Sequence, residues 1–323
     1  MQAFEHVNAT TANEAAELLA ADPQARAIAG GTDLVPEMRL GVREPDRLIN
    51  LKTIKEAAGI CDVDGHVQIG ALTRLSDVAA HPLIQKNFPC LVDAIRDAAS
   101  PQLRNVATLG GNLCQDSRCW YFRGPFACWL KGGTCCDAEH GDNRHQAIFG
   151  GGPCYTVHPS DPATALVALN ARLLIQGVEG ERTVSLHDFF RIPYDNHRAL
   201  NILEPGELVR RIDIPWPTSG ERSVFLKAMD RSAFSFALAS VACILKVESG
   251  RVRAARLVLG AVAPIPWRAI GSEHILTGHT LDDQTIERAA VAATHGARPL
   301  SMNGYKIPLI HGLVERALHQ LSD

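Results

Sequence analysis

The cysteines of this chain are concentrated in one segment, and this constrains the possible folds more than any other feature of the sequence. Six of the nine cysteines lie in the segment that begins at Cys114 and ends at Cys154. A glycine-rich motif precedes this segment and a proline-marked turn follows it. Thiolates gathered between two turns are typical of a metal centre, so redox chemistry is the first hypothesis. The six are Cys114, Cys119, Cys128, Cys135, Cys136 and Cys154.

The spacing within the segment favours an iron–sulfur cluster over zinc. Zinc sites usually contain tight C-x2–4-C pairs, and the spacings Cys119-x8-Cys128-x7-Cys136-x17-Cys154 are wider than that. Aromatic side chains beside the cysteines would keep water away from a cluster. From the residues alone, zinc and free thiols remain the alternatives. The aromatic neighbours are Trp120, Tyr121, Trp129 and Tyr155.

Composition narrows the class of protein. A chain of 323 residues is long enough for two domains. The net charge of −3 and the lack of a Lys/Arg block argue against nucleic acid as a partner. No apolar run reaches the roughly 18–20 residues that a membrane span needs. Residues 1–6 do not begin a signal peptide, so we expect a cytoplasmic protein, or a periplasmic one only through export with a signal-bearing partner.

The order of predicted elements indicates an α+β chain with two domains. Strands and short helices alternate to about residue 175, which favours an α/β domain. A hairpin is expected across residues 178–180. Beyond residue 193 antiparallel strands are expected, with a hairpin at Ser249-Gly250, followed by helices over 281–293 and 305–321. The boundary is expected within residues 193–219.

Two glycine motifs are candidate cofactor loops. Residues 29–34 (AGGTDL) lie between an expected strand and an expected helix, where glycines let a backbone approach a ligand closely. Residues 108–112 (TLGGN) are a second motif of this kind, preceded by polar Ser100 and Arg104. Neither motif is G-x-G-x-x-G or a P-loop, and each alone is also compatible with an ordinary turn. Together the two motifs favour a dinucleotide ligand, with one loop contacting each of its two halves.

Three charged residues are further candidates. Asp161 is placed to cap the helix expected over residues 163–169, and its carboxylate could also accept hydrogen bonds from ribityl or ribose hydroxyls. Lys227 and Arg231 lie at an expected strand end, where they are either solvated or face a flavin or its phosphates. Cys61, Cys90 and Cys243 are expected to be ordinary buried thiols, and Cys114 to pack on the flavin side.

Residues 29–34 together with residues 100–114 (SPQLRNVATLGGNLC) resemble the flavin-binding subunit of molybdenum hydroxylases, the superfamily of xanthine dehydrogenase and carbon monoxide dehydrogenase. The similarity covers nearly the whole chain. It implies a bipartite α/β FAD-binding domain of the vanillyl-alcohol oxidase type over 1–215, with a cysteine-rich insertion at about 114–157. A smaller α+β domain with an antiparallel sheet and helices would follow over 216–323.

The resemblance implies a set of FAD contacts and four ligands of a [4Fe–4S] cluster. The first motif would supply Ile28, Ala29, Gly30, Gly31, Thr32, Asp33 and Leu34. The second would supply Ser100, Arg104, Thr108, Gly110, Gly111 and Asn112, joined by Asp161 and Lys227. The cluster ligands would be Cys119, Cys128, Cys136 and Cys154; Cys136 aligns better than Cys135, which could substitute for it.

Two branches of the family carry such a cluster. In the 4-hydroxybenzoyl-CoA reductase flavoprotein, the last ligand falls where this chain has His145. In bacterial three-subunit aldehyde oxidoreductases it precedes a stretch like residues 155–161, which Cys154 fits. The resemblance therefore implies the FAD and [4Fe–4S] subunit of a heterotrimeric molybdenum-dependent aldehyde oxidoreductase. A large subunit would hold the molybdenum cofactor, and electrons would pass through [2Fe–2S] clusters of a small subunit to this flavin and on to an external acceptor.

No residue of this chain is then expected to act as acid or base on the aldehyde. The alternatives are the flavoprotein of a 4-hydroxybenzoyl-CoA reductase-like enzyme, or a zinc-stapled scaffold subunit without flavin.

Overall fold

The N-terminal sheet is parallel and positions the first glycine motif. In the computed structural model, which describes residues 1–194 and 197–322, this sheet has the strand order β1-β3-β2. Helix α1 begins after Thr11, whose Oγ1 accepts a hydrogen bond from the Glu14 N–H at 3.1 Å. The elements are β1 (Glu5–Asn8), α1 (Ala12–Ala21), β2 (Ala25–Ile28), α2 (Leu34–Arg39) and β3 (Arg47–Asn50).

The second sheet is antiparallel, with the strand order β4-β5-β8-β6-β7. The hairpin expected across residues 178–180 is confirmed, because β6 pairs with β7 in a register that joins Gly177 to Gly180. Strand β8 is contributed by a distant part of the chain and lies between β5 and β6. The strands are β4 (Ile60–Val63), β5 (His66–Gly70), β6 (Arg172–Gly177), β7 (Gly180–Ser185) and β8 (Leu208–Pro215).

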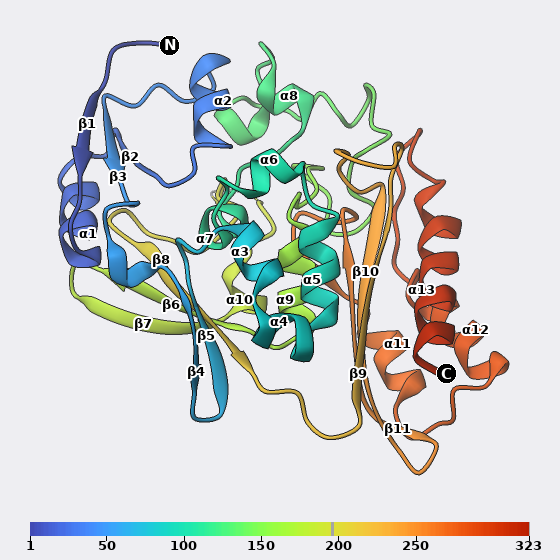
Figure 1. Ribbon diagram of the computed structural model, residues 1–323. Coiled ribbons are helices and arrows are strands. Elements are labelled where there is room, and N and C mark those ends of the chain that lie inside the picture. The colour runs from blue at the N-terminus through green and yellow to red at the C-terminus, as the bar shows by residue number, and fades with distance from the viewer. Residues whose placement is uncertain (195–196, 323) are drawn as a thin grey trace.

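Short helices fill the space between the second and third sheets (Figure 1). They form the core with Phe88, Leu91, Ile95 and Leu166, all fully buried. The helices of this part of the chain are α3 (Leu75–Ala80), α4 (Pro82–Asn87), α5 (Pro89–Arg96), α6 (Pro101–Arg104), α7 (Leu109–Leu113), α9 (Asp161–Ala168) and α10 (Leu186–Phe189), with 3-10 turns at Lys55–Ala57 and Trp129–Lys131. Helix α8 (Trp120–Arg123) lies outside this space, beside α2 (Figure 1).

The third sheet is antiparallel and is covered on both faces. Its order is β12-β11-β10-β9, and the predicted hairpin is confirmed at Ser249 and Gly250, whose φ angles of 51° and 75° suit a tight turn. Side chains alternate along β10: Ala242 and Ile244 join the core formed with α5 and α9, and Cys243 packs towards α11–α13. The elements are β9 (Glu221–Ala228), β10 (Ala239–Glu248), β11 (Arg251–Gly260), β12 (Trp267–Arg268), α11 (Ile270–Leu276), α12 (Asp283–Ala292) and α13 (Lys306–Ser322).

The fold agrees with the α+β class predicted from the sequence. Parallel and antiparallel sheets with helices occupy the first two thirds of the chain, and a helix-covered antiparallel sheet follows (Figure 1). Helix α11 was not predicted, whereas α12 and α13 coincide with the expected ranges. Among the described residues, no helix is both long and apolar enough to pass through a membrane.

The end of the cysteine segment is fastened to the start of α13. Asn303 donates hydrogen bonds from Nδ2 to the carbonyls of Gln146 and Ala147, at 3.1 and 3.3 Å. The fully buried Lys306 donates from Nζ to the carbonyl of His145 at 3.1 Å and to that of Ala261 at 2.7 Å. The segment is therefore held by the C-terminal helices as well as by its own loops.

Lys306 makes the stability of the protein depend on pH. Burial lowers the pKa of Lys306 from its ordinary value of 10.5 to about 7. Between these values the unfolded chain binds a proton that the folded chain does not, so stability rises with pH, by up to about 5 kcal/mol. We expect Lys306→Met to remove most of this slope in urea denaturation between pH 7 and 10, whereas Lys246→Met at the surface retains it. Equal slopes in wild type and Lys306→Met would contradict this assignment.

Candidate functional site

The first glycine motif forms an open loop between β2 and α2. Gly31 has a φ of 69°, the left-handed region that glycine adopts most readily. A Cβ at Gly30 would lie 2.3 Å from the carbonyl oxygen of Val106, so the first glycine motif packs against the residues that directly precede the second. The backbone N–H groups of residues 30–33 donate no hydrogen bond to any residue that the structure describes. They are therefore free to bind a ligand.

The second glycine motif begins helix α7. Thr108 caps it by accepting a hydrogen bond from the Gly111 N–H at 3.2 Å, and Gly110 packs so closely on Ala71 that a Cβ would lie 2.7 Å from it. Asn112 accepts a hydrogen bond on Oδ1 from the Ser160 hydroxyl at 2.5 Å. The motif thus connects α7 to the N-terminus of α9.

Two cavities flank the glycine motifs and share Thr32, Asp33, Gly111 and Gln115. The larger, about 660 Å³, is named here the Arg26 cavity, and Ile28, Ala29, Gly30, Gly31, Leu34 and Thr108 also line it. The other, about 570 Å³, is named the Lys227 cavity, and Asn112, Arg118, Cys119, Asp161, Lys227 and Phe236 also line it. Cavities of this size accommodate cofactors. A ligand with two linked halves fits one cavity on each side of the loops.

Three of the predicted contacts do not line either cavity. Ser100 caps α6 by accepting a hydrogen bond from the Leu103 N–H at 3.3 Å. Arg104 donates to the Ala98 carbonyl at 2.7 Å, and Gly110 faces Ala71. These three residues support the walls rather than form them.

Asp161 and Lys227 form a buried ion pair in the wall of the Lys227 cavity. Lys227 Nζ lies 2.7 Å from Asp161 Oδ2 and donates to the Asp97 carbonyl at 2.8 Å. Burial raises the pKa of Asp161 to about 6, against the opposing effect of Lys227. The predicted capping role of Asp161 is wrong: Ser160 caps α9 by accepting a hydrogen bond from the Ala163 N–H at 3.0 Å. Asp161 occupies the first helical position, where its carboxylate turns to Lys227 instead.

Loss of Asp161 alone is expected to destabilise the protein strongly. Asp161→Ala leaves the Lys227 ammonium buried without a carboxylate, which typically costs about 3–5 kcal/mol. The double variant Asp161→Leu/Lys227→Met removes both charges and should recover most of that loss. Urea denaturation of the three proteins measures both effects. A double variant no more stable than Asp161→Ala would show that the ion pair is not the cause.

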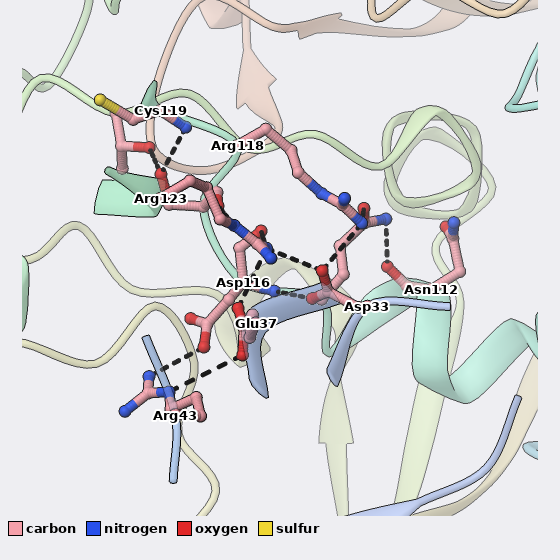
Figure 2. Close-up of polar contacts among 11 residues, drawn as sticks. Asp33, Glu37, Arg43, Asn112, Asp116, Arg118, Cys119 and Arg123 are labelled. Carbon is pink, nitrogen blue, oxygen red and sulfur yellow. Dashed lines mark hydrogen bonds and ion pairs between the residues drawn. The ribbon is translucent and has the colours of Figure 1, made fainter. Parts of the chain in front are cut away.

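An ion-pair network joins the first glycine motif to the cysteine segment (Figure 2). Asp33 Oδ1 lies 2.9 Å from Arg118 and 2.7 Å from Arg123, and Asp33 Oδ2 accepts a hydrogen bond from the Asp116 N–H at 2.7 Å. Arg123 also lies 3.0 Å from the buried Glu37 of α2. The network holds helix α8 against the glycine loop, and neither Arg118 nor Arg123 belongs to the predicted site.

The four predicted metal ligands face one another, and each sulfur receives backbone N–H groups. Burial raises the pKa of Cys119 and of Cys128, and a neighbouring thiol adds to each rise, Cys128 at Cys119 and Cys136 at Cys128. The Cys154 thiol donates a hydrogen bond to Cys136, which lowers the pKa of Cys136 to about 6 and raises that of Cys154. The donors are the N–H groups of Tyr121 and Phe122 at Cys119, Leu130 and Lys131 at Cys128, Ala138, Glu139 and Tyr155 at Cys136, and Thr156 at Cys154.

The remaining cysteines are separate from this group. Cys135 is exposed, and its thiol contacts Asp137 at 3.9 Å. Burial raises the pKa of Cys114 to about 12, and Cys114 lines the Arg26 cavity. Cys90 and Cys243 are buried as predicted, but the prediction for Cys61 is wrong: it is exposed on β4, an edge strand.

The distances between the four sulfur atoms are relevant to the kind of metal centre. No three of them lie within 4.8 Å of one another. A tetrahedral zinc site requires sulfur atoms about 3.8 Å apart, as Zn–S bonds near 2.3 Å dictate. Gln146 donates a hydrogen bond to the Cys119 sulfur at 3.3 Å, which orients this side chain further. Cys136 and Cys154 are in hydrogen-bond contact, and neither of the other two sulfur atoms lies within 4.8 Å of both.

Residues that sequence reasoning missed complete the Lys227 cavity. Ser160, Arg118 and Phe236 line it, and Gln146 lies against Cys119. Arg118 directly precedes Cys119, the first predicted ligand, and this position in the sequence could have indicated that Arg118 belongs to the site. Phe236 lies in the loop between β9 and β10, and nothing local in the sequence links that loop to the glycine motifs.

Comparisons with known proteins cover almost the whole chain. The family described as the FAD binding domain in molybdopterin dehydrogenase matches residues 2–217, and the CO dehydrogenase flavoprotein C-terminal domain matches residues 224–321. The aldehyde oxidoreductase FAD-binding subunit PaoB of Escherichia coli K12 is 34% identical over 315 residues, covering 96% of this chain and 95% of that protein. The glyceraldehyde dehydrogenase medium chain of Sulfolobus acidocaldarius is 28% identical, covering 92% and 89%.

Solved structures show the same fold. The carbon monoxide dehydrogenase structure from Hydrogenophaga pseudoflava contains a chain that matches with a TM-score of 0.79 and 26% identity, over 98% of this chain and 96% of that one. Quinoline 2-oxidoreductase from Pseudomonas putida 86 also gives a TM-score of 0.79 with 26% identity, over 99% and 97%.

Proposed function

Because the chain belongs to the FAD-binding subunits of the molybdenum hydroxylases, the family of xanthine dehydrogenase and carbon monoxide dehydrogenase, we propose that it is the FAD and [4Fe–4S] subunit of a heterotrimeric aldehyde oxidoreductase. The chain is an oxidoreductase subunit with an FAD-binding domain. In the proposed assembly a large subunit holds the molybdenum cofactor and a small subunit supplies electrons from [2Fe–2S] clusters. An external acceptor takes them from this chain.

One observation carries the proposal: Cys119 lines the same cavity as Asn112, Asp161 and Lys227. The proposed cluster ligand and the proposed flavin contacts therefore share one wall. Bound FAD supplies the ability to accept and release electrons one or two at a time. The residues of this chain hold the cofactors close together and shield them from water.

The residues present fit FAD. The N–H groups of residues 30–33 are free to donate to the diphosphate, and the loop is packed closely enough that a Cβ at Gly31 would lie 3.2 Å from Val35. The Arg26 and Lys227 cavities meet at these loops, one for each half of a dinucleotide. Asp161 and Lys227 offer a carboxylate and an ammonium in the wall of the Lys227 cavity. Ser100, Arg104 and Gly110 are proposed to support these contacts.

The thiols also fit the proposed cluster better than zinc. No three of their sulfur atoms lie close enough together to share one ion, and the backbone N–H groups that they receive are the kind that tune iron–sulfur potentials. Cys136 is favoured over Cys135 as the ligand because Cys136 contacts Cys154 and Cys135 is exposed. The hydrogen bond between Cys136 and Cys154 favours Cys154 as the last ligand and hence the aldehyde branch. We also propose a domain division at residue 215, the last residue of β8, which is the last strand along the chain to join the second sheet.

The substrate class is tested on the whole complex. An aldehyde added without air should bleach the flavin absorbance of this subunit, because electrons reach it from the molybdenum site. A 4-hydroxybenzoyl-CoA ester should not oxidise a complex that has first been reduced chemically. Bleaching by no aldehyde, together with reoxidation by the CoA ester, would support the reductase alternative instead.

A further inference from the structure

Arg118 contacts three parts of the chain, and Figure 2 shows it between the cysteine segment and Asp33. Its guanidinium lies 2.9 Å from Asp33 of the first glycine motif and donates to Gln115 Oε1 at 3.2 Å. It also lies over the ring of Phe236, at 5.3 Å from the ring centroid. Phe236 belongs to the loop between β9 and β10. Because Cys119 is the next residue, one side chain connects the cysteine segment, the glycine loop and the third sheet.

The guanidinium is part of the wall of the Lys227 cavity, and the protein alone does not satisfy all its donors. The side chain is 28% exposed, and its buried Nε–H has no acceptor among the described residues. An arginine remains charged at all relevant pH values, and its planar fork suits a planar acceptor. A partly desolvated cation in a cavity wall acts strongly on any charge that develops inside the cavity.

Its positive charge is only partly compensated by the protein. Asp33, its partner, is shared with Arg123 at 2.7 Å. The third arginine of the network, Arg43, pairs with Asp116 at 2.8 Å. Burial raises the pKa of Glu37, the remaining carboxyl group, to about 7, so near neutral pH it is ionised only in part. The three arginines thus exceed the carboxylate charge around them.

We propose that Arg118 is a positioning residue that fixes the cysteine segment against the flavin cavity, and that its charge raises the reduction potential of the bound flavin. The inference rests on the proposed function. Two-electron reduction with uptake of one proton adds one negative charge to a flavin. A fixed cation in the wall stabilises this form relative to the oxidised one. Arg118 would thereby draw electrons to the flavin side of the cavity.

The flavin potential of the FAD-loaded protein tests this inference. Arg118→Gln should lower the ratio of affinities for reduced and oxidised FAD at least tenfold, which corresponds to about 30 mV for a two-electron couple. Arg118→Lys keeps the charge and should restore most of the potential. Arg211→Gln is the matched control, because Arg211 pairs with Asp213 at the same 2.9 Å and is similarly exposed at 33%, outside both cavities. It should leave the potential unchanged.

An unchanged potential in Arg118→Gln, or an equal fall in Arg118→Lys, overturns the inference. If Arg118→Gln purifies without FAD, its dissociation constants for oxidised and for dithionite-reduced FAD are measured by titration. A greater loss for reduced FAD supports the inference, and an equal loss of both overturns it. A wild-type protein that binds no FAD overturns the proposed function itself, and this is seen before any variant is compared.

Discussion

Serine in place of Cys119, Cys128, Cys136 or Cys154 is expected to remove about four irons per chain, because a [4Fe–4S] cluster depends on thiolate from each ligand. A serine hydroxyl stays protonated near neutral pH and replaces thiolate poorly. Each variant should also lose the broad visible absorption of the cluster and retain flavin bands. Iron analysis and an absorption spectrum of each purified variant measure the effect.

The chain supplies a close control for this experiment. Cys135 is adjacent to Cys136 but is exposed, and its thiol faces Asp137. Cys135→Ser should therefore keep its iron, as should Cys61→Ser on the exposed edge strand β4. Loss of iron in Cys135→Ser together with a full complement in Cys136→Ser would transfer the ligand role to Cys135.

Gly31→Val is expected to abolish retention of FAD. The φ of 69° at Gly31 disfavours any β-branched residue, and a Cβ there already lies 3.2 Å from Val35. The larger side chain would therefore displace the loop whose free N–H groups, at residues 30–33, are proposed to hold the diphosphate. Flavin released by heating the purified protein, measured by fluorescence, gives the retained fraction.

A valine at a second glycine, Gly65, is the control for the effect of backbone strain alone. Gly65 lies in the turn between β4 and β5, has a φ of 82° and has no atom within 4 Å of its Cβ position. Gly65→Val therefore carries a similar conformational cost without approaching either cavity, and it should keep its FAD. Equal flavin content in Gly31→Val and wild type would refute the assignment of the loop.

Local patterns predicted much of the fold correctly. The hairpin at Ser249 and Gly250 was predictable because a Ser-Gly pair between two strand-like runs is typical of a tight turn, and the 17-residue helix α13 matches the range expected from the sequence. Helix α11 is short and lies directly after β12, so no long periodic run distinguishes it. The choice of Cys119, Cys128, Cys136 and Cys154 as ligands came from their spacing and from the family resemblance.

Features that depend on tertiary contacts were not predictable in this way. Aspartate is a residue type that often caps helices, which is why Asp161 was predicted to cap α9. In the structure its carboxylate binds Lys227 of β9, and Ser160 caps α9 instead. The contact between Arg118 and Phe236 joins segments far apart in the chain, and only the packing of the third sheet creates it. Cys61 was expected to be buried on composition, but it lies on a sheet edge that nothing covers among the described residues.

The central claim is that this chain holds a flavin and an iron–sulfur cluster at one cavity. The most direct test is the FAD, iron and zinc content of the purified wild-type protein, determined on the same sample. The account predicts stoichiometric FAD, about four irons per chain and no stoichiometric zinc. Stoichiometric zinc without iron, in a protein that retains no flavin, would contradict the account and support a zinc-stapled scaffold.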